Sequence, residues 1–208
     1  MTERLNIAPT KSNQLRIKRE LEMASDGYQL LEQKREILVM ELMRLLDQVK
    51  AVQKEMELRQ QKAYATLRRA LALNGYNEMH RIAEGIQYNH DIVAETRVIA
   101  GVRVPELKMS QGKFHSQFGF VGTDSQVDQT MEDFLALAET VGHLAELETA
   151  VWLLARELRK TQRRVNALDS IFLPQYRKTL HFIEESLESK ELDSFFTLKM
   201  VKKKTQGE

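Results

Sequence analysis

The stretch that decides the fold is residues 9–73, PTKSNQLRIKRELEMASDGYQLLEQKREILVMELMRLLDQVKAVQKEMELRQQKAYATLRRALAL. Its apolar residues recur at alternating steps of four and three from Ile17 to Leu73, and only Arg35, Arg59 and Thr66 interrupt them. No proline lies between residues 9 and 73, so the backbone can stay helical for roughly 60 residues. A seven-residue repeat kept over about eight heptads predicts a narrow apolar seam that another helix covers in a left-handed supercoil.

Local signals mark the ends of this first helix. Thr10 or Ser12 offers an N-cap hydroxyl where the periodic residues begin, and Asn74-Gly75 provides a glycine stop signal. The sequence therefore predicts an irregular lead over residues 1–9 and helix one over residues 10–73.

The next segment has a different pattern. Residues 98–105 are rich in β-branched side chains, residues 118–123 form a second short extended candidate, and residues 80–89 can add a helical turn or two. Several glycines lie between Gly101 and Gly122, which indicates turns. We therefore predict a compact insert over residues 74–127 that contains a short β-hairpin.

A second long helix follows the insert. Apolar residues from Phe134 to Leu187 recur at an average spacing of about 3.5, which predicts helix two, with its own seam, over residues 128–199. Three successive steps of four between Leu168 and Leu180 change the phase around Pro174, and we expect a kink there because the repeat resumes beyond the proline. Residues 200–208 are predicted to be a basic flexible tail.

Two seams in one chain can cover each other. The predicted fold class is mainly α, with two very long helices in an antiparallel left-handed coiled coil and a small hairpin-bearing insert between them. The predicted register places Leu73 opposite Met131 and Ile17 opposite Leu187. A parallel homodimer fits the periodicity as well, but closing two seams within one chain has the smaller entropic cost.

The charges that interrupt the seams give this register a test. Arg35 falls opposite Asp169, and Arg59 falls near Glu146 and Glu148. We interpret these oppositely charged residues as the groups that fix the register, as polar residues at seam positions can do.

Composition narrows the function classes. The 208 residues carry a net charge of +1, which argues against extensive nucleic-acid binding. The chain has no cysteine, which fits a reducing compartment and excludes disulfides and thiolate ligands. Residues 1–9 do not resemble a signal peptide, and no window approaches 18 uninterrupted apolar residues. We therefore expect a protein that reaches a membrane only through partners.

A search for chemistry finds no catalytic, cofactor-binding or metal-binding residues. Gly112-Lys113 lacks the Ser or Thr and the earlier glycine of a phosphate-binding loop. The histidines are scattered, and the pairing of Glu139 with His143 at i and i+4 is expected by chance among so many helical charges. No Glu-x-x-His pair for a di-iron bundle exists, and nothing supports nucleophilic catalysis. We expect no cofactor and no enzymatic activity of the chain itself.

Four features have two interpretations each. Residues 37–46 are apolar on nearly every side, so they pack tightly against helix two or dock a second protein. Trp152 packs on the flank of the seam or contacts a partner. Residues 202–204 are three lysines that form a solvated end or a functional basic tip, and Gly27 is tolerated or marks a close approach or weak point.

A set of motifs extends in order along almost the whole chain. They are Pro9-Thr10-Lys11-Ser12-Asn13 with Leu15-Arg16-Ile17-Lys18-Arg19-Glu20-Leu21, the run from Gly27 to Leu42, Gly101-Val102-Arg103-Val104-Pro105, Arg163-Arg164-Val165-Asn166-Ala167-Leu168 with Pro174, and Phe195-Phe196-Thr197-Leu198-Lys199. Together they closely resemble the D subunits of V-type and A-type (vacuolar and archaeal-type) rotary ATPases, and the short tail after Lys199 is similar to prokaryotic members.

The resemblance implies a non-catalytic central-stalk subunit, the rotor shaft of an ion-translocating ATPase. Its implied partners are the small F subunit of the rotor, the A and B subunits of the catalytic head, and an adaptor subunit of C/d type on the membrane rotor, with no nucleic acid and no membrane insertion. The implied location is cytoplasmic, peripheral to the membrane through the complex. Basic residues near both chain ends (Lys11, Arg16, Lys18, Arg19, Lys199, Lys202, Lys203 and Lys204) predict a positively charged tip that enters the head.

Two other functions are compatible with parts of the pattern. A homodimeric coiled-coil tether or scaffold accounts for the seams, but it does not explain why residues 37–46 are apolar on nearly every side. A helical-bundle enzyme with a metal site needs ligand pairs that the chain lacks. Within the rotor interpretation, a kink at Pro174 would make the inserted end asymmetric, so that rotation presents different faces to the catalytic sites in turn.

Overall fold

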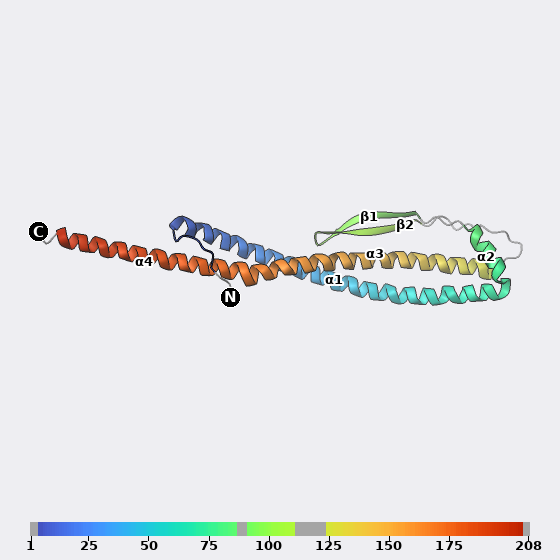
Figure 1. Cartoon of the computed structure of the whole chain (residues 1–208). Helices are drawn as coiled ribbons and strands as arrows, with labels where there is room; N and C mark the ends of the chain where they lie inside the picture. Colours follow the sequence, from blue (N-terminus) through green and yellow to red (C-terminus); the bar gives the residue numbers. More distant parts are fainter. Residues whose placement is uncertain (1–3, 87–90, 111–123, 206–208) are drawn as a thin grey trace. The chain divides into compact units, whose positions relative to one another are not determined.

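The structure is a computed structural model that describes residues 4–86, 91–110 and 124–205. Its elements are α1 (Lys11–Asn74), α2 (Tyr76–Gly85), β1 (Asp91–Ile99), β2 (Val102–Ser110), α3 (Ser125–Ala167), the π-helical turn η1 (Leu168–Phe172) and α4 (Leu173–Thr205) (Figure 1). This architecture confirms the predicted fold class: very long helices that pack together, and a small insert with an antiparallel hairpin.

Both ends of α1 follow the local signals in the sequence. The Thr10 side-chain oxygen accepts a hydrogen bond from the Asn13 backbone N–H at 3.2 Å, so Thr10 is the N-cap. The helix ends at Asn74, and Gly75 follows with φ of 79°, a left-handed conformation that favours glycine. Gly27 lies within α1, and a Cβ added there would meet no atom within 4 Å, so no close approach requires this glycine.

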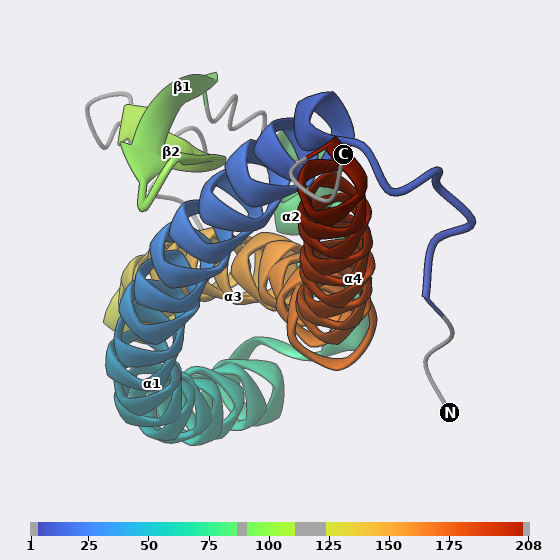
Figure 2. The ribbon, with the colours of Figure 1, turned by 90° about the vertical axis from the view of Figure 1, so that its left-hand side faces the viewer.

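The chain divides into two compact units, and the first comprises Met1–Glu36 and Leu158–Glu208. In this unit the first turns of α1 lie beside α4 in antiparallel orientation (Figures 1 and 2). The Lys11 ammonium lies 2.7 Å from the Glu191 carboxylate, and Ile17 and Ile183 are fully buried. The segment before α1 packs back onto α4, where the Leu5 N–H donates to the Thr179 hydroxyl at 3.0 Å.

The predicted pairing of Arg35 with Asp169 is wrong. The Arg35 guanidinium donates to the Gln162 side-chain oxygen at 3.1 Å and pairs with Glu32 on its own helix. Asp169 lies seven residues beyond Gln162, which is one heptad. A heptad repeat is unchanged when one helix slides by seven residues, so apolar periodicity alone cannot distinguish these two registers.

The second compact unit comprises Ile37–Glu157 and contains the rest of α1, α2, the hairpin and most of α3. Here α1 and α3 run antiparallel (Figure 1), and Lys62 forms a 2.8 Å ion pair with Asp133 across the interface. The buried apolar core lies between these helices, with a pair of fully buried leucines, Leu38 and Leu154. Burial of such side chains supplies the main stabilisation of a two-helix interface.

The register in this unit also differs from the prediction. Arg59 donates to the Ala136 carbonyl oxygen at 2.9 Å and pairs with Glu55, and neither Glu146 nor Glu148 bonds it. At the insert end Met131 shares a pocket with Leu67, whereas Leu73 is 65% exposed.

The phase change around Pro174 takes the form of a π-helical turn. The Leu173 N–H bonds to the Leu168 carbonyl five residues earlier, which introduces one extra residue into the turn before the proline. As a result Leu173 is buried, and Phe172, which lies on the steps of four between Leu168 and Leu180, is exposed. The helix continues through this point, as expected, because the π turn accommodates the missing N–H. The size of any bend stays a prediction.

The insert differs from its predicted layout in the pairing of its strands. β1 and β2 pair antiparallel through the short turn at Ala100 and Gly101, so the first predicted extended segment, residues 98–105, contains the end of β1, the turn and the start of β2. The second predicted segment, residues 118–123, lies outside the described residues. Helix α2 occupies Tyr76–Gly85, near the helical turns predicted over residues 80–89.

The predicted flexible tail is helical over most of its length. α4 continues to Thr205, so residues 202–204 lie on its last turn. No proline or glycine lies between Pro174 and Gly207, and lysines are favourable at a helix C-terminus because they complement the helix dipole.

Candidate functional site: interaction surfaces

The first candidate surface is the outer side of residues 37–46, which we call the α1 collar. Leu38 and Leu45 face the core, whereas Ile37, Met40 and Met43 are 47%, 63% and 61% exposed. Packing against α3 therefore does not cover the collar. Exposed methionines on an apolar surface suit protein contacts, because the flexible thioether adapts to the shape of a partner.

Trp152 on α3 is a second exposed apolar group. Its side chain is 62% exposed, and the Arg156 guanidinium lies 5.7 Å from the ring centroid. Flank packing within the chain thus buries only a minor part of the indole. A large exposed aromatic ring with an arginine beside it is a typical protein-interface composition.

The third surface is the end of α4, which we call the α4 tip (residues 192–204). The pairing of α1 with α4 ends at Lys11 and Glu191, and α4 continues past the start of α1 (Figure 1). Every residue of the tip is exposed. Six large apolar side chains and four lysines share this stretch: Leu192, Phe195, Phe196, Leu198, Met200, Val201, Lys199, Lys202, Lys203 and Lys204. A single helix that is apolar on several sides requires a surrounding partner surface.

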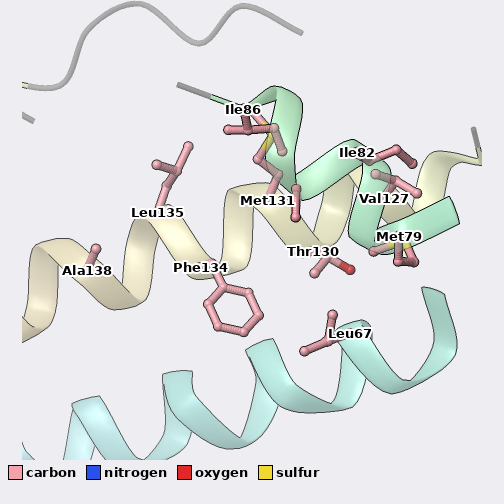
Figure 3. A pocket seen from close by; sticks show the side chains of 11 residues that line it. Leu67, Met79, Ile82, Ile86, Val127, Thr130, Met131, Phe134, Leu135 and Ala138 are labelled. Carbon is pink, nitrogen blue, oxygen red and sulfur yellow. The ribbon is translucent and has the colours of Figure 1, made fainter. Parts of the chain in front are cut away.

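An apolar pocket of about 360 Å³ lies where α1, α2 and α3 meet (Figure 3). Leu67 of α1, Met79 and Ile82 of α2, and Met131 and Phe134 of α3 contribute to its lining. The lining contains almost no polar group, so the pocket offers no anchor for a polar substrate. It is a further apolar contact surface at the insert end of the second unit.

Asp133, which precedes the pocket residue Phe134 on α3, is a buried carboxyl group that is only 6% exposed. Burial opposes ionisation of its carboxyl group, but hydrogen bonds from Lys62 and Gln129, together with the charge of Lys62, outweigh burial and hold the pKa of Asp133 below its usual value. The ionised carboxylate is therefore a structural group that joins α1 to α3.

The pKa of Asp133 predicts a loss of stability in acid. A carboxyl group whose pKa is lower in the folded state stabilises the fold above its unfolded pKa of about 3.9, and this contribution disappears as the pH falls through the folded value. Asp133→Asn should destabilise the protein by about 1–2 kcal/mol at neutral pH and should weaken the acid dependence of unfolding below about pH 4. Urea unfolding at several pH values measures both effects.

The control for this prediction is the exposed neighbour Glu132, whose change to Gln should alter neither quantity by more than about 0.5 kcal/mol. Equal acid dependence in Asp133→Asn and the unchanged chain would contradict the structural role of the carboxylate.

The titratable residues form no assembled catalytic or metal centre in the part of the chain that the structure describes. His80, His143 and His181 each lie within 4 Å of a single carboxylate, at 3.4, 3.8 and 3.3 Å. The carboxylate near His143 is Glu146, and not Glu139, whose spacing from His143 is expected by chance. Among the described residues no cluster of three or more His, Asp or Glu side chains could hold a metal ion.

Two of the histidines and the Gly-Lys pair of the chain lie outside the described ranges. His90, His115 and Gly112-Lys113 lie in residues 87–90 and 111–123. None of the described helices contains a stretch long and apolar enough to cross a membrane. Sequence reasoning identified the collar, Trp152 and the basic end, but missed the α1–α2–α3 pocket, because its lining depends on how α2 packs.

Long paired helices with several exposed apolar surfaces define a coiled-coil interaction protein. Comparison with known proteins assigns the family. The family described as the D subunit of ATP synthase matches residues 13–203. The chain is 40% identical to D-subunit protein 2 of the V-type ATP synthase of Treponema pallidum, over 94% of each chain. It is also 37% identical to the A-type ATP synthase D subunit of Pyrococcus horikoshii, over 97% of this chain and 96% of the relative. A V-type D subunit from Thermotoga neapolitana is 32% identical over 96% of this chain and 98% of the relative. The chain belongs to the ATP synthase D-subunit family.

Proposed function

We propose that the chain is the central-stalk subunit of a V-type or A-type ATPase and transmits torque between the catalytic head and the ion-translocating membrane rotor. The observation that carries the proposal is family membership over nearly the full length. A shaft needs rigidity and specific contact surfaces, and it needs no reacting groups of its own. The chain therefore acts as a non-catalytic subunit, located in the cytoplasm and attached to the membrane through the complex.

The α4 tip is the surface proposed to enter the catalytic head, between the A and B subunits. Its apolar side chains suit a surrounding sleeve of protein, and its lysines suit acidic groups on the rim of that sleeve. The insert end of the second unit carries the apolar α1–α2–α3 pocket, which is proposed to seat on the adaptor subunit of the membrane rotor. The π turn before Pro174 supports the hypothesis that the inserted end is asymmetric.

A direct rotation assay tests the proposal. The chain has no cysteine, so Tyr76→Cys, at a position that is 72% exposed, gives a single attachment point for a bead. In a complex with the head fixed to a surface and the membrane rotor absent, the bead should rotate when ATP is added. A bead that stays still while the same complex hydrolyses ATP would exclude the shaft function.

The collar is proposed to bind the small F subunit of the rotor. Met40→Glu with Met43→Glu should weaken binding of the F subunit by about a hundredfold, because two charges would have to be buried in the contact. Both side chains are mostly exposed, so the unfolding free energy of the chain should change by less than about 1 kcal/mol. Calorimetric titration of the F subunit into the full-length chain measures the affinity.

The matched control for the collar is Met23→Glu, a methionine of α1 that is 74% exposed and lies outside residues 37–46. Its affinity for the F subunit should equal that of the unchanged chain. Equal affinity in the double variant would place the binding of the F subunit elsewhere.

The alternative function, a homodimeric tether, is not favoured because family members are named as subunits of one complex. Light scattering separates the two functions further. The stalk subunit should be monomeric, or form a one-to-one complex with the F subunit, whereas a tether should be a dimer of this chain.

A further inference from the structure

The hydrogen-bonding pattern of the hairpin follows from its turn. Ala100 and Gly101 have φ angles of 50° and 79°, the positive values of a two-residue type I′ turn. Ile99 and Val102 therefore form the closing hydrogen-bonded pair, and the pairs alternate from there along the register. In β1 the odd-numbered backbone groups point inward to β2. The even-numbered groups, from Ile92 to Val98, point to the outer edge.

The outer edge of β2 is closed in two ways. Pro105 pairs with Thr96 at a non-hydrogen-bonded position, so the proline places its missing donor on the outer edge. Two residues further on, the outward Leu107 N–H donates to the Glu146 carboxylate of α3 at 3.3 Å. A proline and a side-chain cap are devices that prevent a strand edge from pairing with another chain.

The outer edge of β1 has no such protection. Residues 92–98 are all exposed, with Ile92, Val93 and Val98 at 55%, 53% and 63%. Residues 91–99 contain no proline, and no hydrogen bond from another described residue reaches the outward N–H and C=O groups of Ile92, Ala94, Thr96 and Val98. These groups form a template for one more strand.

We propose that β1 takes up an extended strand from a partner subunit of the assembled ATP synthase, which would turn the hairpin into a three-stranded sheet. The strand chemistry follows from the two faces of β1. One face presents Ile92, Ala94, Thr96 and Val98 and suits β-branched apolar residues. The other face presents Glu95, which already pairs with Lys108 at 2.7 Å, and Arg97, which suits an acidic residue on the added strand.

A second copy of this chain is the less favourable occupant. Two β1 strands could pair around Thr96 with Glu95 against Arg97, but that edge contact would leave most side chains on both faces exposed. Stable dimers bury about 1,200–2,000 Å² of surface. A partner subunit that also contacts neighbouring surfaces can reach that range. The inference requires assembly with other subunits, and it holds whether or not the chain transmits torque.

Amide hydrogen exchange resolved to single residues tests the proposal on the full-length chain, alone and in the assembled complex. In the isolated chain the amides of Val93, Glu95, Arg97 and Ile99 should be protected by the ladder, and those of Ile92, Ala94, Thr96 and Val98 should exchange fast. Assembly should slow exchange of the even-numbered amides by at least about tenfold. Unchanged fast exchange of these amides in the complex would overturn the proposal.

A proline variant removes one outward donor without touching the ladder. Thr96→Pro should weaken binding of the full-length chain to the remaining subunits by about tenfold, whereas Thr96→Val, which keeps the N–H, should bind normally. Protection of the odd-numbered amides verifies that the hairpin of the variant is intact. If it is not, Ala94→Lys provides the test, because a lysine at this exposed edge position opposes strand addition while the N–H is retained.

The outcomes separate the possible occupants. Weaker binding of Thr96→Pro or Ala94→Lys together with assembly-dependent protection supports a partner strand. Protection that appears in the isolated chain and grows with its concentration identifies a second copy and overturns the proposal. Normal binding of both variants also overturns it. If the variants bind more weakly and assembly protects the even-numbered amides, but the bead does not rotate, the added strand is established and the torque function is excluded.

Discussion

Ending the chain after Glu191 is expected to abolish ATP-driven rotation while both compact units stay folded. The last pair between α1 and α4 is Lys11 with Glu191, so the truncation removes only residues that have no part of α1 opposite them. The unfolding free energy should change by less than about 0.5 kcal/mol. Coupled activity should fall at least about tenfold, because the head loses the only apolar helix proposed to fill it. Bead rotation and proton- or sodium-coupled ATP hydrolysis measure the effect.

Two further variants show which property of the α4 tip matters. A chain that ends at Thr205 keeps the helix and should rotate normally. Replacing Lys202, Lys203 and Lys204 by Gln keeps the apolar side chains and should reduce coupling mainly at low ionic strength, where long-range attraction is strong. Full coupling in the chain that ends after Glu191 would contradict the proposed role of the tip.

Leu154→Ala is expected to destabilise the protein by about 3 kcal/mol, because deletion of a fully buried leucine removes apolar burial and leaves a cavity. Leu154 has no exposed surface and lies in the core of the second unit. Urea unfolding followed by circular dichroism measures the change as a lower midpoint at constant slope.

Trp152→Ala is the matched control, since Trp152 lies two residues away on the same helix and is 62% exposed. Its unfolding free energy should change by no more than about 0.5 kcal/mol. Equal destabilisation by the two substitutions would mean that the ring is buried in the folded protein and the leucine contributes less than its burial indicates.

The long helices could be predicted because their signals are local and repeated. A proline-free stretch with a seven-residue apolar repeat predicts α1, and Thr10 and Gly75 mark its ends by backbone chemistry that depends only on neighbouring residues. The hairpin was predicted from β-branched residues. Its turn and both strands required the pairing of Ile99 with Val102, which the pattern did not identify.

The register could not be predicted because it depends on contacts between distant residues. Arg35 would meet a polar residue at either Gln162 or Asp169, and the two choices differ by one heptad. The π turn adds a related difficulty. The steps of four around Pro174 indicate a phase change, but they do not say which of Phe172 and Leu173 turns inward, and the structure buries Leu173.

Some of the candidate surfaces could be predicted from the sequence, and others could not. Residues 37–46 and the lysines of residues 202–204 are evident as composition, so the collar and the α4 tip could be predicted in part. The closed edge of β2 could not, because it depends on Glu146 of α3 reaching the Leu107 N–H from 39 residues away.

The hydrogen bonds of the buried threonines do not hold the paired helices against sliding along each other. The hydroxyls of Thr66, Thr130, Thr140 and Thr179 all donate to carbonyl oxygens three or four residues earlier in their own helices. These bonds would survive an axial slip, whereas the Lys62–Asp133 pair and the Arg35–Gln162 bond would break. Among the polar contacts, resistance to a force along the helix axis therefore comes from the few that join two helices. Raising the ionic strength should weaken the Lys62–Asp133 ion pair first.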